Sequence, residues 1–238
     1  LDTLGRNVLG TPEEPVNHFT SPGAITAAAG VGMFFNPRTM DQEEIDRLGA
    51  ESVALTHGSP LAFLPGAVVA HLISRCLRDR KASLEELIEE SLEALFRQFG
   101  HQYGQTQEIA ALVRQAMVLA QDETLSHTDA MEQLRCETGA QVLAGSVYAC
   151  LTCGGDFDAA MITAVNHSGR SAAVGALTGA VLGARMGARA LPEFYLECLE
   201  PAMTLVELAD DLYHGCPMEM GNRLFDDDWD RKYLHGGK

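Results

Sequence analysis

A short polar stretch followed by a small-residue helix carries the residue types best suited to chemistry in this chain. The stretch Asn166–Ser171 reads NHSGRS and leads directly into an apolar segment that extends to Ala188. Its imidazole, hydroxyls and guanidinium therefore lie just before the predicted start of a helix. The first amides of a helix have no partner within it, and the helix dipole places partial positive charge there. This combination is suited to holding an anion or a sugar phosphate.

Glycine recurs at every fourth position of this predicted helix, at Gly175, Gly179, Gly183 and Gly187. Positions four apart share one face of a helix, and each glycine lowers helix stability by about 1 kcal/mol relative to alanine. We therefore expect another backbone to pack very close to this face. Three interpretations are open: a membrane helix, a buried central helix without chemistry, and a buried helix whose polar first turn forms part of a pocket. Arg185 and Arg189 count against a membrane helix, and we favour the pocket.

The turn and helix resemble a motif of the ADP-ribosylglycohydrolases, the enzymes related to dinitrogenase reductase-activating glycohydrolase. Their turn typically reads N-x-G-G-D-[ST]-D-[ST] or NHSGDSDST, and its two aspartates help to hold a pair of magnesium ions. In this sequence those aspartate positions are Arg170 and Ala172. Arginine keeps its positive charge in proteins, and alanine offers no ligand atom. We therefore expect the di-magnesium site to be lost, with no cofactor, no metal ligand and no catalytic residue of the family type in its place.

Two earlier segments carry the same resemblance. Residues 21–33 are similar to the family's S-x-G-A-x-M-R-x-A-P-x-G-L element, and the agreeing positions are Ser21, Gly23, Ala24, Ala29 and Gly32. Thr26 and Ala27 stand where that element has Met-Arg. The turn Thr56–Pro60 is similar to the family's T-H-x-x-P, and we expect His57 to be a hydrogen-bonded turn residue there.

The resemblance implies a remnant ligand pocket between these segments. Its members are polar and small residues of the two larger motifs, namely Ser21, Gly23, Asn166, His167, Ser168, Gly169, Arg170 and Ser171. Arg170 at a helix start is suited to an anionic group, such as the diphosphate of an ADP-ribose-like ligand. A solvent-facing or salt-bridged arginine is an equally good interpretation of this residue.

Apolar periodicity without strand-like alternation predicts an all-α fold. The resemblance implies a single, orthogonally packed multi-helix domain over residues 1–238, with residues 1–20 irregular and residues 215–238 an irregular acidic tail. The main predicted helices span residues 41–57, 61–78, 83–99, 107–123, 128–135, 139–153, 158–165, 171–188 and 192–213.

Local signals define several helix ends. Ser21 and Pro22 are typical of a helix start, Ser83–Glu86 is a capping box, and Asp156 is expected to cap a short helix. Pro201 is expected to kink or break the last helix.

The charge balance restricts the partners. There are 33 Asp and Glu residues against 17 Lys and Arg, which gives a net charge of −16. This excludes binding to a nucleic-acid backbone, which needs a basic surface; it suits a basic protein partner, and it also serves solubility. The run Asp226–Asp228 in the tail is expected to be solvated charge.

The cysteines indicate a compartment. The chain has six cysteines and no secretory signal, so we expect reduced thiols in a cytoplasmic protein that does not enter a membrane. Cys150 and Cys153 form a C-x-x-C without a second pair at zinc spacing, and we expect both to be core residues.

Two elements that the resemblance would place first are not found in this sequence: a Gly-Asp-Ala-x-Gly helix and a Thr-Asp-Asp-Thr motif. The chain is then either a short, degenerate member or one whose first segment was trimmed. A missing segment would leave an apolar face exposed, which favours a homodimer or a protein partner.

Three functions are open. The first is a pseudoenzyme that binds an ADP-ribose-like ligand or a protein. The second is an active ADP-ribosylglycohydrolase that removes ADP-ribose from a modified protein side chain, with a rearranged metal site that uses Asp156, Asp158 or His167. The third is a structural or immunity-type protein whose partner is an ADP-ribosyltransferase. We favour the first and third over the second.

Overall fold

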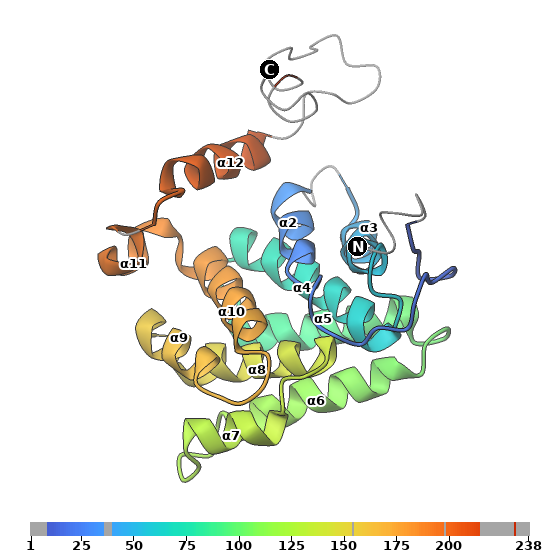
Figure 1. The fold of residues 1–238 in the computed structure, drawn as a ribbon, viewed down its shortest axis with the longest axis horizontal. Coiled ribbons are helices and arrows are strands. Elements are labelled where there is room, and N and C mark those ends of the chain that lie inside the picture. Colours follow the sequence, from blue (N-terminus) through green and yellow to red (C-terminus); the bar gives the residue numbers. More distant parts are fainter. Residues whose placement is uncertain (1–8, 36–39, 154, 198, 215–230, 232–238) are drawn as a thin grey trace. The chain divides into compact units, whose positions relative to one another are not determined.

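The structure is a computed structural model that describes residues 9–35, 40–153, 155–197, 199–214 and 231. All regular secondary structure in these ranges is helical, as the sequence predicts (Figure 1). The helices are α2 (Ala27–Phe34), α3 (Gln42–Ala54), α4 (Pro60–Arg78), α5 (Leu84–Phe99), α6 (Gln105–Leu119), α7 (His127–Leu134), α8 (Gly139–Cys153), α9 (Phe157–Val165), α10 (Ser171–Met186), η1 (Ala188–Ala190), α11 (Glu193–Glu197) and α12 (Ala202–His214).

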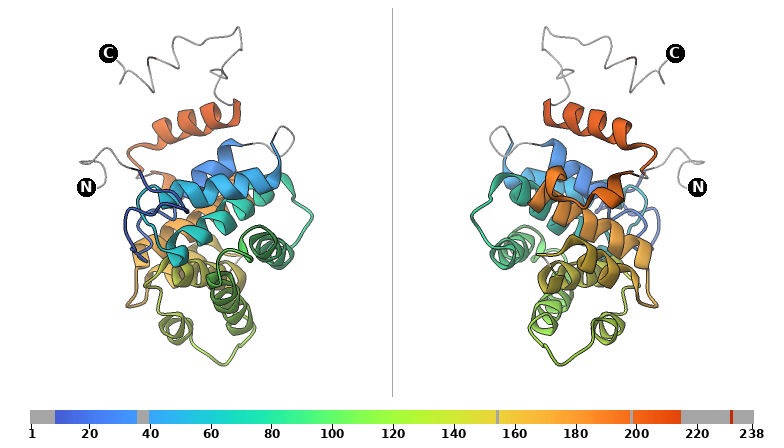
Figure 2. Two further views of the ribbon diagram at one scale, coloured as in Figure 1. Left: turned by 90° about the vertical axis from the view of Figure 1, so that its right-hand side faces the viewer. Right: turned by 90° about the vertical axis from the view of Figure 1, so that its left-hand side faces the viewer.

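The chain divides into two compact units, Leu1–Tyr195 and Leu196–Lys238. Two long helices organise the first unit. Helix α4 contacts α2, α3, α5, α6, α8 and α10, and helix α8 contacts α4, α6, α7, α9 and α10. Helices α2 and α3 lie on one side of α4, and α6 and α8 lie on the other (Figures 1 and 2). The core therefore extends between α4 and α8, and α10 contributes to it from the side.

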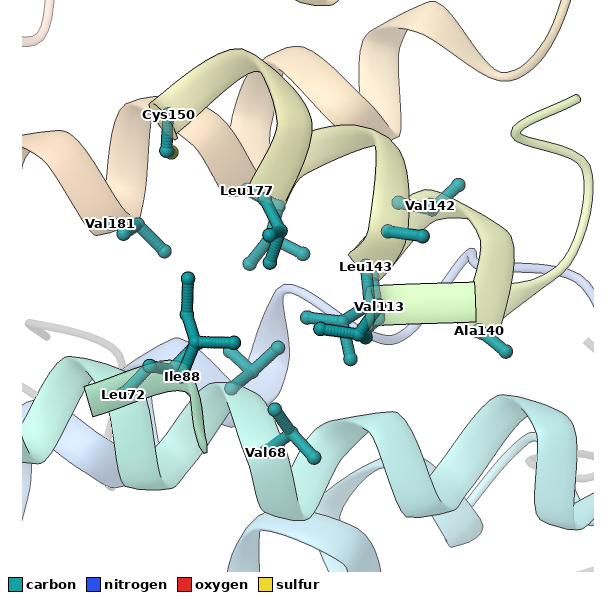
Figure 3. Close-up of a cluster of buried hydrophobic side chains, with 14 of the residues drawn as sticks. Val68, Leu72, Ile88, Val113, Ala140, Val142, Leu143, Cys150, Leu177 and Val181 are labelled. Carbon is teal, nitrogen blue, oxygen red and sulfur yellow. The ribbon is translucent and has the colours of Figure 1, made fainter. Parts of the chain in front are cut away.

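Branched apolar side chains of α4, α5, α6, α8 and α10 meet in this core (Figure 3). Leu72 of α4, Ile88 of α5, Leu143 of α8 and Leu177 of α10 are each at most 1% exposed. Val113 of α6 is fully buried beside them. The burial of apolar surface from helices far apart in sequence stabilises the arrangement that holds the cleft described below.

Helix α4 is largely buried. Ser59 and Pro60 begin it, Arg75 and Arg78 lie in its last turn, and the predicted bounds are confirmed to within one residue. Its length and apolar composition match those of a membrane span, but 78% of that window is buried inside the protein. Burial of this kind is typical of a core helix.

The glycine face of α10 does not receive a backbone, so that prediction is wrong. A Cβ at Gly175 would meet a side-chain carbon of Val165, and one at Gly179 would meet the sulfur of Met161, both from α9. A Cβ at Gly183 would meet nothing within 4 Å. Side chains rather than a main chain cover this face, because α9 is the helix that packs on it.

The close backbone approach occurs instead between α3 and α4. A Cβ at Gly49 would lie 2.6 Å from the carbonyl oxygen of Gly66, and the reverse distance is also 2.6 Å. The two helices can cross at this separation only because neither residue has a side chain. Each of these helices contains a single glycine, so no glycine repeat marks this contact in the sequence.

Helix α2 begins at Ala27 rather than at Pro22, which corrects a second prediction. The preceding residues form tight turns, with the amide of Ile25 donating to the carbonyl of Pro22. The N-cap position is Thr26, and the hydroxyl of Ser21 lies within hydrogen-bond distance of His57.

The other helix signals are confirmed. Ser83 and Glu86 form both hydrogen bonds of the capping box, and the carboxylate of Asp156 accepts from the amide of Ala159 at the start of α9. The helix predicted to break near Pro201 is divided into α11 and α12.

The described cysteines are buried and free. They are Cys76, Cys136, Cys150 and Cys153. Burial raises the pKa of Cys76 to about 11 and the pKa of Cys136 to about 12, and a raised pKa makes a thiol unreactive. The Cys150–Cys153 pair belongs to the core, as expected. Cys198, Cys216 and Asp226–Asp228 lie outside the described residues.

Candidate functional site

An open cleft of about 400 Å³ lies between the segment before α2 and the first turn of α10. It is lined by Ser21, Pro22, Gly23, Gly169, Arg170, Ser171, Ala172 and Ala173. The fold therefore brings together residues that are about 150 positions apart in sequence. Of the predicted pocket residues, Ser21, Gly23, Gly169, Arg170 and Ser171 line this cleft, whereas Asn166, His167 and Ser168 do not.

Both walls of the cleft are attached to the stretch that runs from the end of α7 to the first residue of α8. The amide of Gly139 donates to the carbonyl of Thr20 over 2.9 Å, which fixes the wall that contains Ser21. The amide of Arg170 donates to the carbonyl of Cys136, also over 2.9 Å, which fixes the opposite wall. This stretch therefore holds both walls in place.

Asn166 and His167 shape the turn rather than the cleft. The amide group of Asn166 donates to the carbonyl of Ile162 over 2.7 Å. The Nε2 atom of His167 lies 3.1 Å from the carbonyl oxygen of Ala164, and its Nδ1 atom accepts from the amide of Gly169. Because Nδ1 accepts, Nε2 carries the proton that is donated to Ala164, and the ring is fixed in one tautomer.

Ser168 connects the turn to α7. Its amide and its hydroxyl donate to the two carboxylate oxygens of Glu132, over 2.8 and 2.5 Å. These hydrogen bonds, first from the hydroxyl and then from the amide, lower the pKa of Glu132. Ser168 is thus a positioning residue of the turn.

The backbone between α7 and the cleft is unusual. Arg135 and Cys136 have φ angles of 63° and 52°, which places two consecutive residues other than glycine in the left-handed region. A Cβ at Gly169 would collide with the carbonyl of Arg135 and with Cys136. Only glycine fits at this contact. Sequence reasoning missed Glu132, Arg135 and Cys136, because they lie more than 30 residues before the turn and no local pattern marks them.

Arg170 is a salt-bridged residue at the edge of the cleft. Its Nε atom donates to Oε2 of Glu137 over 3.2 Å, and the two side chains are 61% and 50% exposed. The exposed Ala172 follows on the same helix turn. The structure confirms the salt-bridged interpretation of Arg170, and it also places the residue in the cleft.

On the wall opposite Arg170, Ser21 forms a hydrogen bond with His57. Its Oγ atom lies 3.1 Å from Nε2 of His57, and Nδ1 of the same ring lies 2.9 Å from Oγ1 of Thr56. Burial lowers the pKa of His57. His57 is therefore a hydrogen-bonded turn residue, as the sequence predicts, but its partner in the cleft was not anticipated.

Comparison with protein-family models adds the decisive observation. The model described as ADP-ribosylglycohydrolase matches residues 4–221 of the chain. The chain belongs to the ADP-ribosylglycohydrolase family. Comparison with curated proteins gives no match.

The cleft of this ADP-ribosylglycohydrolase-family chain does not fit the pair of magnesium ions that the family resemblance implies. Magnesium prefers carboxylate oxygens at octahedral positions. The residues that line the cleft offer two hydroxyls and a guanidinium, and no carboxylate. Across the described residues, no group of three or more His, Cys, Asp or Glu side chains is arranged to hold a metal ion.

The three residues that could provide a rearranged metal site have hydrogen-bond partners outside the cleft. Asp156 caps α9, and Asp158 accepts a 2.6 Å hydrogen bond from the hydroxyl of Tyr195. His167 is held within the turn. None of the three lines the cleft.

Proposed function

We propose that this ADP-ribosylglycohydrolase-family chain binds an ADP-ribose-like ligand in the cleft and does not carry out the metal-dependent hydrolysis of its family. The observation that carries the proposal is the position of Arg170 and Ala172. Both line the cleft, at the positions where the family motif has aspartates.

Charge is the physical reason. Two magnesium ions about 4 Å apart need several carboxylates to offset their charge. A guanidinium at the same place adds a permanent positive charge, because arginine stays protonated in proteins. The positive charge of Arg170 therefore repels a cation at the edge of the cleft, where the aspartates of the family motif would attract one.

The same features favour an anion. The guanidinium of Arg170 matches the geometry of a phosphate, and the positive end of the α10 dipole lies in the same cleft. The salt bridge to Glu137 uses Nε of Arg170. Within the described residues no protein group bonds to its terminal amino groups, which leaves them for a ligand.

Calorimetric titration of ADP-ribose into the protein, with and without Mg²⁺, tests this proposal. We expect binding that is the same in both conditions and that weakens in Arg170→Gln. A matched control is Arg114→Gln, because Arg114 forms an exposed salt bridge with Glu89 outside the cleft. This variant should bind as the wild type does.

Two results would contradict the proposal. Binding that requires Mg²⁺, or release of ADP-ribose that EDTA abolishes, would show that carboxylates from elsewhere rebuild the family site. An absence of binding in both conditions would exclude ADP-ribose as the ligand of the cleft. The net charge of −16 supports a basic protein as the alternative partner, and a pull-down with an ADP-ribosyltransferase then becomes the next experiment.

A further inference from the structure

The cleft wall contains a hydroxyl–imidazole pair that the ligand-binding proposal does not use. Ser21 lines the cleft, and its Oγ atom lies 3.1 Å from Nε2 of His57. The Nδ1 atom of the ring lies 2.9 Å from Oγ1 of Thr56. A serine becomes a nucleophile when a base within hydrogen-bond distance takes its proton and a third group orients that base. Ser21, His57 and Thr56 have the positions of the nucleophile, the base and the orienting group.

We propose that Ser21 is a nucleophile, that His57 is its general base, and that Thr56 orients the imidazole ring. In this arrangement Nδ1 of His57 donates its proton to Thr56, and Nε2 accepts the hydroxyl proton of Ser21. The substrate class is a small activated acyl compound, such as an ester with a good leaving group, that enters the open cleft.

The surroundings of His57 support its role as a base. Burial lowers its pKa, which favours the neutral ring, the form that can accept a proton. The ring of Phe19 contacts the imidazole edge-on, with the ring centroids 6.3 Å apart. This contact and the hydrogen bond to Thr56 hold the ring in one orientation.

The cleft also provides a place for the negative charge that develops in such a reaction. The first turn of α10 forms the wall opposite Ser21. The amides of Ser171 and Ala173 already donate to the carbonyls of Gly169 and Arg170, so this wall offers an oxyanion the amide of Ala172 and the positive end of the α10 dipole.

The chemistry balances without a metal or a redox partner. The Ser21 oxygen attacks the carbonyl carbon while Nε2 of His57 takes the hydroxyl proton. The bond between the carbonyl carbon and the leaving oxygen then breaks, and the proton passes from His57 to the leaving group. Water attacks the resulting acyl-serine with His57 again as base, which releases the acid and restores the hydroxyl.

This inference does not depend on the binding of ADP-ribose, because it concerns one wall of the cleft and a small electrophile. A fluorophosphonate is a suitable probe. The Ser21 oxygen forms a bond to phosphorus, the phosphorus–fluorine bond breaks, fluoride leaves, and His57 takes the proton. Mass spectrometry then identifies the labelled peptide.

We expect a single adduct on Ser21, which Ser21→Ala abolishes. His57→Gln should slow the labelling about 100-fold, which is within the usual contribution of a general base. Thr56→Val keeps the size of the side chain and removes the oxygen that orients the ring, so it should slow the labelling less. The matched control is His127→Gln, because His127 also pairs with a hydroxyl, that of Tyr148, outside the cleft; its labelling should equal that of the wild type.

Several results would overturn the inference. They are the absence of an adduct, an adduct on other residues only, and labelling of Ser21 that a folded His57→Gln variant leaves unchanged. Nitrogen NMR of the wild type gives an independent readout: the inference requires the proton on Nδ1 of His57, and a proton on Nε2 would contradict it even if the variants failed to fold.

Discussion

Ser168 is bound twice by the carboxylate of Glu132, once through its amide and once through its hydroxyl. One residue belongs to the turn before α10, and the other to α7. The pair therefore attaches the turn to a helix that contributes no residue to the cleft lining. It follows that the geometry of the cleft depends on residues that a search for ligand-binding side chains does not find.

The Glu132–Ser168 pair predicts a dependence on pH. The pKa of Glu132 is lowered in the folded protein by the hydrogen bonds from Ser168. A lowered pKa means that the pair stabilises the fold above the unfolded value, which is about 4.3, and that this contribution is lost as the pH falls through the folded value. We expect the protection factor of the Ser168 amide, which compares its exchange rate with the intrinsic rate at the same pH, to fall as the pH drops below the unfolded value. The Ser168 amide in Glu132→Gln should have a low protection factor at neutral pH that changes little in acid, and equal protection factors in both proteins would contradict the prediction.

Removing the carboxylate beside Arg170 should strengthen anion binding. Glu137 shares the guanidinium with any ligand, so Glu137→Gln leaves the arginine fully available. The pair is exposed, and exposed pairs contribute up to about 1 kcal/mol, so we expect affinity for ADP-ribose to rise by about two- to five-fold. Titration calorimetry measures this change. Glu89→Gln, which removes the partner of Arg114, is the matched control, and an unchanged affinity in Glu137→Gln would show that Arg170 does not contact the ligand.

Two glycine substitutions should have opposite effects on stability. In Gly169→Ala the new Cβ would collide with the backbone of Arg135 and with Cys136, and overpacking of this kind costs about 1–3 kcal/mol. In Gly183→Ala the Cβ meets nothing within 4 Å, so the gain in helix propensity should stabilise α10 by about 1 kcal/mol. Urea unfolding distinguishes the two. A destabilised Gly183→Ala would indicate that another molecule covers this face.

The core between α8 and α10 should be sensitive to truncation. Leu177 is fully buried among side chains from α4, α5 and α8 (Figure 3). Leu177→Ala should therefore lower the free energy of unfolding by about 2–5 kcal/mol, because it removes apolar contacts and leaves a cavity. Val118→Ala, at a position that is 68% exposed, should change stability by less than about 0.5 kcal/mol. Similar effects in both variants would contradict the packing described for this core.

The sequence by itself determined the helices and the family. Apolar periodicity located α4 and α8 nearly to the residue, and the capping box at Ser83 and the aspartate cap at Asp156 both formed. These signals are local, since each depends on residues within one or two turns of the chain. The resemblance of the turn before α10 was equally local, and the family comparison agrees with it.

The tertiary structure alone decided which residues meet. It joined Ser21 to His57 and Arg170 to Glu137, and it formed turns over residues 23–26, so that α2 begins only at Ala27. It also showed that the close backbone contact expected at α10 lies between Gly49 and Gly66. The physical reason is the same in each case. A hydrogen bond or a close contact between distant segments depends on how the helices pack, and the spacing of residues within one segment carries no information about that packing.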